Sequence, residues 1–190
     1  MRLGLIADTH MPGAMEELWP QVFDAFEGAD LILHAGDLHT LGVVRQLEQV
    51  APVHVARGNG DTGIDDERLR DHWVLEFGRI SVGMIHRFPS PQRRSGEQLI
   101  EYAARHFTAT PDVIVYGHTH LEAIHEIDGR LYVNPGSPTL PRNQSLRPGT
   151  IGLMDIEDGS IEVTIMQLTE DGIEPHDEVA AIRKAFEREC

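Results

Sequence analysis

Residues 113–120 read Val113-Ile114-Val115-Tyr116-Gly117-His118-Thr119-His120 and place two imidazoles just beyond a short apolar run. The run Val113–Tyr116 is typical of a buried strand. In extended backbone, residues i and i+2 point to the same side, so His118 and His120 would face one point. Neutral imidazole is the commonest protein ligand for a transition metal. Taken alone, the tetrapeptide is better explained as a solvated turn, and the rest of the chain has to decide.

Four other apolar runs end in side chains of the same kind. The runs and the residues after them are Arg2–Ala7 with Asp8 and His10, Leu31–Ala35 with Asp37, Pro52–Ala56 with Asn59, and Ile80–Ile85 with His86. Sites of α/β sheets form in the crevice beyond the carboxyl ends of the strands. Five runs that deliver carboxylate, imidazole or carboxamide groups to one edge therefore predict a shared centre.

The order of the elements predicts an α/β fold. Two segments with helical spacing alternate with the first three strands: Met15–Glu27, with a start near Pro20, and Leu41–Val50. This alternation is the pattern of a doubly wound parallel sheet. Later runs pair as hairpins around Gly78-Arg79, Asp128-Gly129 and Glu157-Asp158-Gly159. We expect a single domain over residues 1–190, built as a two-sheet β-sandwich flanked by helices in four αββα layers. A further helix is expected over Ser95–His106, and a terminal one over Glu178–Glu189.

Composition restricts the class of partner. The formal charge of −15 over 190 residues predicts a protein that repels nucleic-acid phosphates and anionic membranes. The lone Cys190 excludes an internal disulfide, and no apolar run approaches membrane-spanning length, so we expect a cytoplasmic protein. A homo-oligomer is compatible with the sequence. Any phosphorylated substrate would need local positive charge from metals or arginine.

The candidate residues form a mixed oxygen and nitrogen donor set without thiolate. Such a set suits Mn, Fe, Zn, Ni or Co better than Mg or Ca alone. Seven side chains are too many for one tetrahedral ion but suffice for two ions that share a carboxylate. Two metals about 3.5–4 Å apart can hold a hydroxide and a phosphoryl oxygen together.

These motifs resemble those of the calcineurin-like metallophosphoesterases, and in particular their small bacterial and archaeal phosphodiesterases. The matching motifs are Asp8-x-His10, Gly36-Asp37, Gly58-Asn59-x-Asp61, His86, Gly117-His118-x-His120 and Asn134-Pro135-Gly136-Ser137. The resemblance implies a first metal on Asp8, His10 and His120. It implies a second on Asn59, His86 and His118, with Asp37 bridging both. Asp37, Asn59 and His10 are then also the catalytic residues, and two divalent ions, with Mn first, would deliver a hydroxide in line to phosphorus.

Simpler explanations exist for single residues. Asp8 and His10 alone fit a turn after a strand, Asp37 fits a helix N-cap, and Asn59 fits a glycine-rich turn. Asp61 is expected to anchor its loop instead of binding metal. His34 is the best candidate for a hydrogen bond that supports a ligand. We expect His39 to lie away from the pocket.

The sequence departs from the family pattern at two places. Gly60 stands where related phosphatases often carry a general-acid histidine, so leaving-group protonation by that side chain is excluded. Arg87 and Phe88 follow His86 where many relatives have Gly and then His. Arg87 and Arg57 are therefore candidates for binding the substrate phosphate, because guanidinium matches phosphate oxygens. Arg142 is a further one.

The leading prediction is a phosphodiesterase that acts on a small phosphate ester. A phosphomonoesterase or protein phosphatase is one alternative. A non-catalytic protein-binding scaffold of the same fold is the other. All seven ligand positions carry competent donors, which favours an enzyme.

Overall fold

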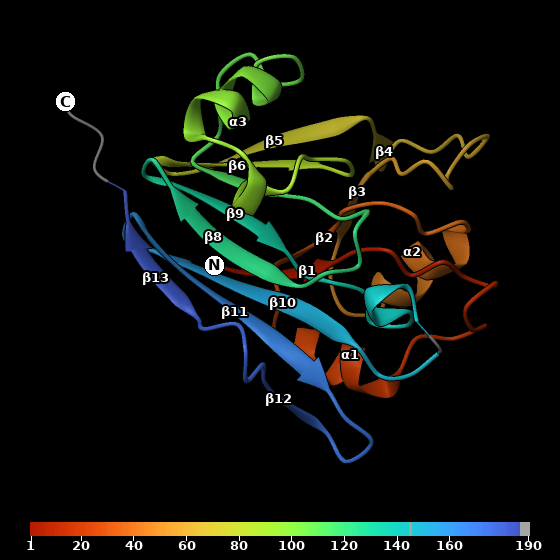
Figure 1. The fold of residues 1–190 in the computed structure, drawn as a ribbon. Coiled ribbons are helices and arrows are strands. Elements are labelled where there is room, and N and C mark those ends of the chain that lie inside the picture. The colour runs from red at the N-terminus through yellow and green to blue at the C-terminus, as the bar shows by residue number, and fades with distance from the viewer. Residues whose placement is uncertain (145, 187–190) are drawn as a thin grey trace.

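The structure, a computed structural model, describes residues 1–144 and 146–186 and contains two mixed β-sheets packed face to face (Figure 1). The larger sheet has the order β12-β11-β10-β1-β2-β3-β4, and β13 also pairs with β11. Its strands are β1 Arg2–Ile6, β2 Leu31–His34, β3 Val53–Ala56, β4 Leu69–Arg70, β10 Thr150–Glu157, β11 Ser160–Leu168, β12 Ile173–Pro175 and β13 Ile182–Ala185. The smaller sheet has the order β5-β6-β7-β9-β8. Its strands are β5 His72–Phe77, β6 Ile80–Ile85, β7 Val113–Val115, β8 Ala123–Ile127 and β9 Arg130–Asn134.

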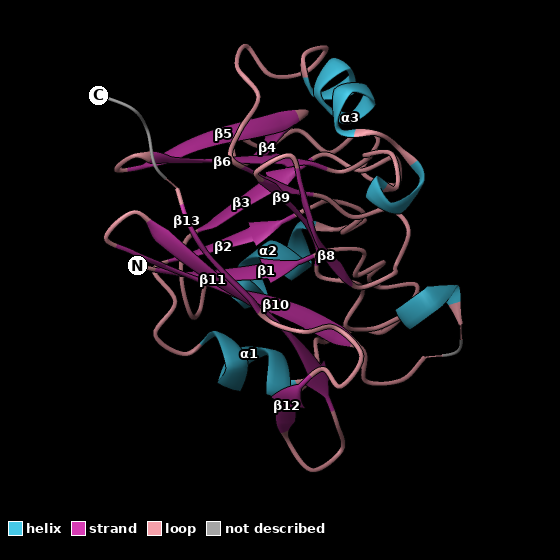
Figure 2. Ribbon diagram, turned by 60° about the vertical axis from the view of Figure 1, so that its left-hand side comes forward, coloured by secondary structure: helices cyan, strands magenta, loops and turns pink. Residues whose placement is uncertain are grey.

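Helices cover the outer faces of both sheets. The α-helices are α1 Pro20–Phe26, α2 Leu41–Leu47 and α3 Gly96–Ala103, and 3-10 turns η1 and η2 span Pro91–Arg93 and Pro141–Asn143. Figure 2 shows α1 and α3 at opposite sides of the stacked sheets. Among the described residues, no helix is long and apolar enough to cross a membrane. The expected four-layer fold is confirmed.

The three apolar clusters follow these layers. Leu3 and Leu5 of β1 point into the cluster between the sheets, whereas Ile6 packs with Phe26 of α1 in the cluster beneath the helices. A Cβ on Gly4 would lie 2.8 Å from the Phe26 ring, so the strand and α1 approach closely because this residue has no side chain. Strand β1 is buried on both faces, which explains its nearly continuous apolar sequence.

Local sequence accounts for the helix starts. Thr40 caps α2 by accepting a hydrogen bond from the Gly42 amide, and Ser95 forms a capping box with Gln98 at the start of α3. Helix α1 begins at Pro20, as expected, because proline fits the first turn of a helix. Helix α3 ends at Ala103, before the predicted His106.

Strand direction brings the predicted ligands to one edge. Strands β1, β2 and β3 are parallel neighbours, so Asp8, Asp37 and Asn59 follow carboxyl ends that lie side by side. Strands β6 and β7 are likewise parallel, and they deliver His86 and the turn at residues 117–120. Helices α1 and α2 both cover one face of the larger sheet, because the smaller sheet occupies the other. The first sheet is therefore not doubly wound.

The predicted terminal helix over Glu178–Glu189 is wrong. Residues 182–185 form β13, which pairs with residues 160–163 of β11, and residues 187–190 lie outside the described chain. Ile182 packs on the core between the sheets, and burial alternates along the strand. Pairing with the open side of β11 therefore outweighs the helix propensity of this alanine- and charge-rich segment. The short strands β4 and β12 were not expected.

Candidate metal centre

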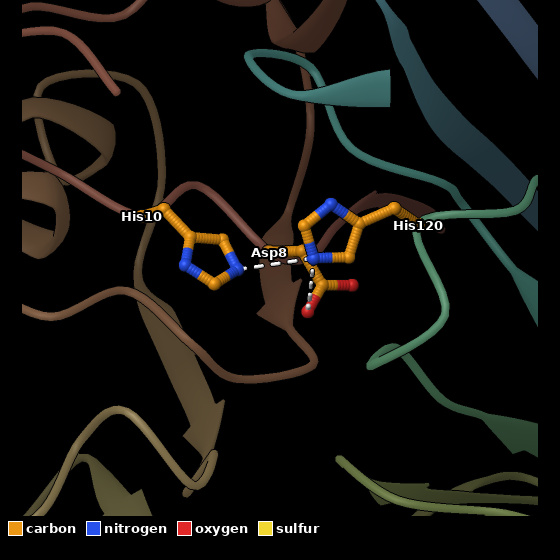
Figure 3. A group of neighbouring side chains, drawn as sticks. All are labelled: Asp8, His10 and His120. Atoms are coloured by element: carbon orange, nitrogen blue, oxygen red, sulfur yellow. Dashed lines mark hydrogen bonds and ion pairs between the residues drawn. The ribbon is translucent and has the colours of Figure 1, made fainter. Parts of the chain in front are cut away.

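The structure brings the predicted first-metal residues together. Donor atoms of Asp8, His10 and His120 all lie within 4.8 Å of one another (Figure 3). The Nε2 atoms of His10 and His120 are 3.0 Å apart, and His120 Nε2 lies 3.7 Å from Asp8 Oδ1. Two ligands of one tetrahedral ion with bonds of about 2.0–2.1 Å are separated by roughly 3.3 Å. The spacing therefore fits a shared cation.

A second donor group lies beside the first. Asp37, His86 and His118 also present donor atoms within 4.8 Å of one another. His86 Nε2 lies 3.5 Å from Asp37 Oδ2 and 3.3 Å from Asn59 Oδ1. Asp37 Oδ2 is also 3.7 Å from His10 Nε2, so this carboxylate reaches both groups. All seven predicted ligands are thus in one centre, and the assignment of each to one ion stays a prediction.

The ligand-bearing turns have an unusual backbone. The φ angle is positive at Asp8 (54°), His10 (48°), Asp37 (57°), His118 (72°) and His120 (55°). The left-handed region is uncommon for residues other than glycine, although Asp and His are enriched there. The expectation that His118 and His120 converge through extended backbone is therefore wrong. A left-handed turn after β7 directs one imidazole to each donor group.

Backbone carbonyls orient two of the imidazoles. His86 Nδ1 donates to the carbonyl of Ala35 (2.7 Å), and His120 Nδ1 donates to the carbonyl of Leu140 (2.8 Å). A neutral ring that donates from Nδ1 keeps Nε2 free as a lone-pair donor. When the His86 ring is neutral, its Nε2 lone pair faces the oxygens of Asp37 and Asn59, whereas in metal-free protein a second ring proton forms the hydrogen bond to Asp37. A metal ion can take the place of this proton, because His86 Nε2, Asp37 Oδ2 and Asn59 Oδ1 can all coordinate it.

The electrostatics of the two aspartates differ. Burial raises the pKa of Asp8 to about 8, with the charge of Asp37 adding to the effect, although His86 and the His118 amide oppose it. Burial also acts to raise the pKa of Asp37, but hydrogen bonds from His86 and the Gly60 amide outweigh it, so the net pKa falls below its usual range. A cation beside Asp8 would offset the cost of its buried charge. The donor chemistry therefore fits a divalent metal.

Most of the imidazoles in the centre are kept neutral, as metal ligands must be. Burial, followed by the charges of His120 and His39, lowers the pKa of His10 to about 4. Burial is also the main cause of the lowered pKa values of His118 and His120. His86 is the exception: burial lowers its pKa, but the hydrogen bond with Asp37 and the charge of Asp8 outweigh burial and raise it.

Asp61 anchors the loop that carries Asn59, as expected. Its fully buried carboxylate accepts hydrogen bonds from three backbone amides: Asp37 (2.9 Å), His39 (2.8 Å) and Gly58 (2.8 Å). One side chain thus ties the turn after β2 to the turn after β3. Asp37 Oδ1 in turn accepts a hydrogen bond from the Gly60 amide at 2.7 Å, which is a second link between the turns after β2 and β3.

His34 supports the turns that carry the ligands, and its hydrogen bonds go to Gly36 and Thr9 instead of to a predicted ligand. Its Nδ1 accepts from the Gly36 amide (3.1 Å), so Nε2 donates to the hydroxyl of Thr9 (3.1 Å), between Asp8 and His10. Burial lowers the pKa of His34 to about 4, which keeps this arrangement neutral.

The motif at residues 134–137 holds the turn after β7. Asn134 Nδ2 donates to the carbonyl of Gly117 and the hydroxyl of Thr119, and Ser137 Oγ donates to the carbonyl of Asp8. The hydroxyl of Thr119 thereby fixes the turn that carries the two histidines.

The candidate arginines occupy different surroundings. Arg87 lies over the centre, with Nη2 3.0 Å from His118 Nε2. Arg57 lies nearby, but its guanidinium donates to the carbonyls of Asp61 and Ile64. Arg142 pairs with the buried carboxylate of Glu122 at 2.7 Å. Among the described residues, the Arg87 guanidinium makes hydrogen bonds only to the imidazole of His118, through Nε and Nη2, so it is the candidate best placed to meet a phosphate.

His39 belongs to the centre, contrary to expectation. Its ring lies edge-on to that of His10, with centroids 4.4 Å apart, and it forms a third donor group with His10 and Asp37. A Cβ on Gly60 would lie 2.0 Å from His39 Nε2, so His39 occupies the space of a side chain at position 60. The sequence feature that could have indicated His39 is Gly60, because a glycine at this position leaves room for a side chain from a neighbouring turn.

The left-handed backbone of His39 predicts a stability difference between two variants. We expect His39→Gly to be more stable than His39→Ala by about 1 kcal/mol, because only glycine accepts a φ of 65° without strain. Urea unfolding of the metal-free variants measures the difference. The same pair at His125, in strand β8, should show the opposite sign. Equal stabilities of the two His39 variants would contradict the strain.

Metal-free protein is expected to lose stability between pH 6.5 and 8. The Asp8 pKa is about 8 in the folded state against 3.8 for the free side chain, so folded protein holds a proton that unfolded protein has lost. Stability then falls as the pH rises toward 8. The raised pKa of His86 acts in the same direction. The lowered pKa values of His10 and His34 act oppositely, but only below 6.5.

Urea unfolding in a chelator at both pH values tests this dependence. The limiting slope is about 1.4 kcal/mol per pH unit for each proton. Asp8→Asn should flatten the slope, and saturating Mn²⁺ should remove it in the wild type by binding the ionised carboxylate. An unchanged slope in Asp8→Asn would assign the pH dependence to other groups.

Comparison with known proteins identifies similar sequences. The family profile described as "Calcineurin-like phosphoesterase superfamily domain" matches residues 1–159. A probable metallophosphoesterase from Methanothermobacter thermautotrophicus is 41% identical over 144 residues, which cover 75% of this chain and 80% of that protein. A phosphodiesterase from Methanocaldococcus jannaschii is 25% identical over 150 residues, which cover 72% and 83% of the two chains.

Comparison with solved structures supports the architecture. Vacuolar protein sorting 29 from Cryptosporidium parvum superimposes with a TM-score of 0.78 and covers 97% of this chain and 98% of its own. The two sequences are 19% identical, so the similarity concerns the fold alone.

Proposed function

Because the chain belongs to the calcineurin-like phosphoesterase superfamily, we propose that it is a phosphodiesterase that works with two divalent metal ions. The observation that carries the proposal is the pair of donor groups that share Asp37. Asp8, His10 and His120 would hold the first ion, and Asn59, His86 and His118 the second. Bound ions would supply the Lewis acidity that activates water and neutralises charge on the phosphoryl oxygens.

The chain's own residues then position the reactants. Asp37 sets the spacing of the two ligand groups, and the carbonyls of Ala35 and Leu140 hold His86 and His120 in the coordinating tautomer. Arg87, beside His118, would donate to a phosphoryl oxygen and stabilise its charge. The oxygen and nitrogen donors favour Mn²⁺, and the same set accepts Ni²⁺, Zn²⁺, Fe²⁺ or Co²⁺.

Two pockets support a diester over a monoester. The first, here the Tyr102 pocket, has a volume of about 430 Å³, borders Asn59 and His86, and is lined by Arg57, Asp71, Ile85, Arg87, Tyr102 and His106. The second, the Leu140 pocket, has about 400 Å³, borders His10 and His39, and is lined by Gly13, Ala14, Leu140, Gln144 and Leu146. Each pocket thus adjoins a different donor group. A phosphodiester can place one substituent in each, whereas a monoester fills one.

The test is hydrolysis of bis(4-nitrophenyl) phosphate and 4-nitrophenyl phosphate with Mn²⁺, Ni²⁺, Co²⁺ or Mg²⁺. We expect metal-dependent turnover with the diester preferred, and loss of turnover in Asp37→Ala and His120→Ala. Preference for the monoester would favour a phosphomonoesterase or protein phosphatase. If metal binds but neither ester is turned over above the variants, the non-catalytic scaffold replaces the enzyme. If no metal binds, the proposed centre is wrong.

A further inference from the structure

The Tyr102 pocket differs in chemistry from the rest of this acidic protein. It gathers two guanidinium groups, from Arg57 and Arg87, and the aromatic rings of Tyr102 and His106, against one carboxylate from Asp71. The formal charge of the whole chain is −15, so a pocket with more cationic than anionic groups is a local exception. Such a pocket attracts an anion that also carries an aromatic ring.

The two rings stand together on the wall of the pocket. Their centroids are 5.1 Å apart, and both side chains are half-buried, so they retain accessible surface. The Tyr102 hydroxyl donates to the carbonyl of Arg87, and its ring packs edge-on against Phe88, which fixes its position. Burial, helped by the charges of His72 and Arg105, lowers the pKa of His106, so its ring is neutral at neutral pH. A rigid, uncharged aromatic wall suits stacking.

Arg87 is the arginine of this pocket that has no acidic partner among the described residues. Within the described part of the chain, no carboxylate lies within ion-pair distance of its guanidinium, which instead meets His118. The backbone carbonyl of Arg87 thus accepts a hydrogen bond from the Tyr102 hydroxyl, while its guanidinium donates to His118, a predicted metal ligand. The residue therefore connects the aromatic wall to the metal centre.

We propose that the Tyr102 pocket binds a nucleoside-type substituent of the phosphodiester, with its base on Tyr102 and His106 and its phosphate beside Arg87. The inference rests on the proposed function, because it names the substrate class of the same centre. Asp71 pairs through Oδ1 with Arg57 Nε at 3.7 Å, and because its side chain is 87% exposed, its other oxygen offers an acceptor for a ribose hydroxyl or an exocyclic amine. A volume of about 430 Å³ lies in the range of small-molecule sites.

The Leu140 pocket is less suited to a nucleoside substituent than the Tyr102 pocket. The Leu140 pocket contains no guanidinium, and apart from His10 and His39 its walls are glycine, alkyl and amide groups. A purely alkyl substituent in the Tyr102 pocket would leave the Arg87 guanidinium without an anionic partner, whereas Arg57 already meets Asp71 and two carbonyls. The observations therefore place the nucleoside beside Asn59 and His86.

The experiment compares three probes by calorimetry on Mn²⁺-loaded protein and by inhibition of bis(4-nitrophenyl) phosphate hydrolysis. The probes are adenosine 5′-monophosphate, ribose 5-phosphate and inorganic phosphate. Stacking of one base on aromatic side chains contributes roughly 1–3 kcal/mol. We therefore expect adenosine monophosphate to bind at least about 5-fold more tightly than ribose 5-phosphate.

Variants separate stacking from phosphate binding. His106→Ala should reduce the preference for the base at least about 3-fold and leave phosphate binding unchanged. Tyr102→Phe should retain the preference, because it keeps the ring. His125→Ala, in strand β8 outside the residues that line this pocket, is the matched control. Circular dichroism and urea unfolding of each variant confirm that it is folded.

The outcomes distinguish the two proposals. Diester turnover without a preference for adenosine monophosphate over ribose 5-phosphate would overturn the nucleoside pocket and leave the phosphodiesterase standing. Preferential binding without turnover would support the pocket and overturn the enzyme. A preference that survives both His106→Ala and Tyr102→Ala in folded protein would place the base elsewhere.

Discussion

The Asp37→Asn variant is expected to lose phosphodiester hydrolysis by about 10²–10³-fold or more. Asp37 Oδ2 lies 3.5 Å from His86 Nε2 and 3.7 Å from His10 Nε2, so this carboxylate faces the Nε2 atoms of both donor groups. Asparagine keeps the shape of the side chain but removes the negative charge that two cations would share. The variant should therefore bind both metals more weakly, and the loss should appear in kcat as well as in metal affinity.

Metal stoichiometry and turnover, measured on the same samples, test this prediction. His120→Ala and His118→Ala are the matched controls, because each belongs to one donor group only. Each should weaken one of two metals, and a different one. Asp37→Asn should weaken both. Two metals held at wild-type affinity by Asp37→Asn would contradict a shared carboxylate.

Replacing Asp61 by alanine is expected to destabilise the protein by about 3 kcal/mol or more. The carboxylate is fully buried and accepts hydrogen bonds from the amides of Asp37, His39 and Gly58. Alanine would leave the buried amides of Asp37 and Gly58 and the partly buried amide of His39 without an acceptor, and each buried group costs about 1–3 kcal/mol. Activity should fall too, because the same bonds place Asp37 and the loop that carries Asn59.

Urea unfolding of metal-free protein measures the loss directly. Asp61→Asn should be intermediate, since its amide oxygen still accepts hydrogen bonds while its NH₂ group cannot. Asp65→Ala is the control, because Asp65 is an exposed carboxylate in the same loop. A stability of Asp61→Ala within 1 kcal/mol of the control, on the scale of one net hydrogen bond of about 1 kcal/mol, would contradict the anchoring role.

Much of this architecture could be predicted because its signals are local. Short apolar runs identified the central strands, and Asp128-Gly129 identified the hairpin of β8 and β9. Polar residues at the ends of five runs indicated the centre, because a parallel sheet places such ends at one edge. The helix predicted over Glu178–Glu189 was wrong, because residues 182–185 form strand β13. The composition of this segment favours a helix, and only the open side of β11 makes it a strand.

The sequence alone specified which side chains follow each strand, since covalent order places Asp8, Asp37, Asn59 and His86 within three residues of the ends of apolar runs. Tertiary structure decided how they meet. Left-handed turns, the buried carboxylate of Asp61 and the carbonyls that orient the imidazoles bring the donor atoms within reach of one another. The bonds from Asp61 to the turn after β2, and from the imidazoles of His86 and His120 to backbone carbonyls, join residues far apart in the chain, so local pattern carries no signal for them. His39 joined the centre because Gly60, on another loop, leaves the space that its ring fills; the glycine is visible in the sequence, but its proximity to His39 is not.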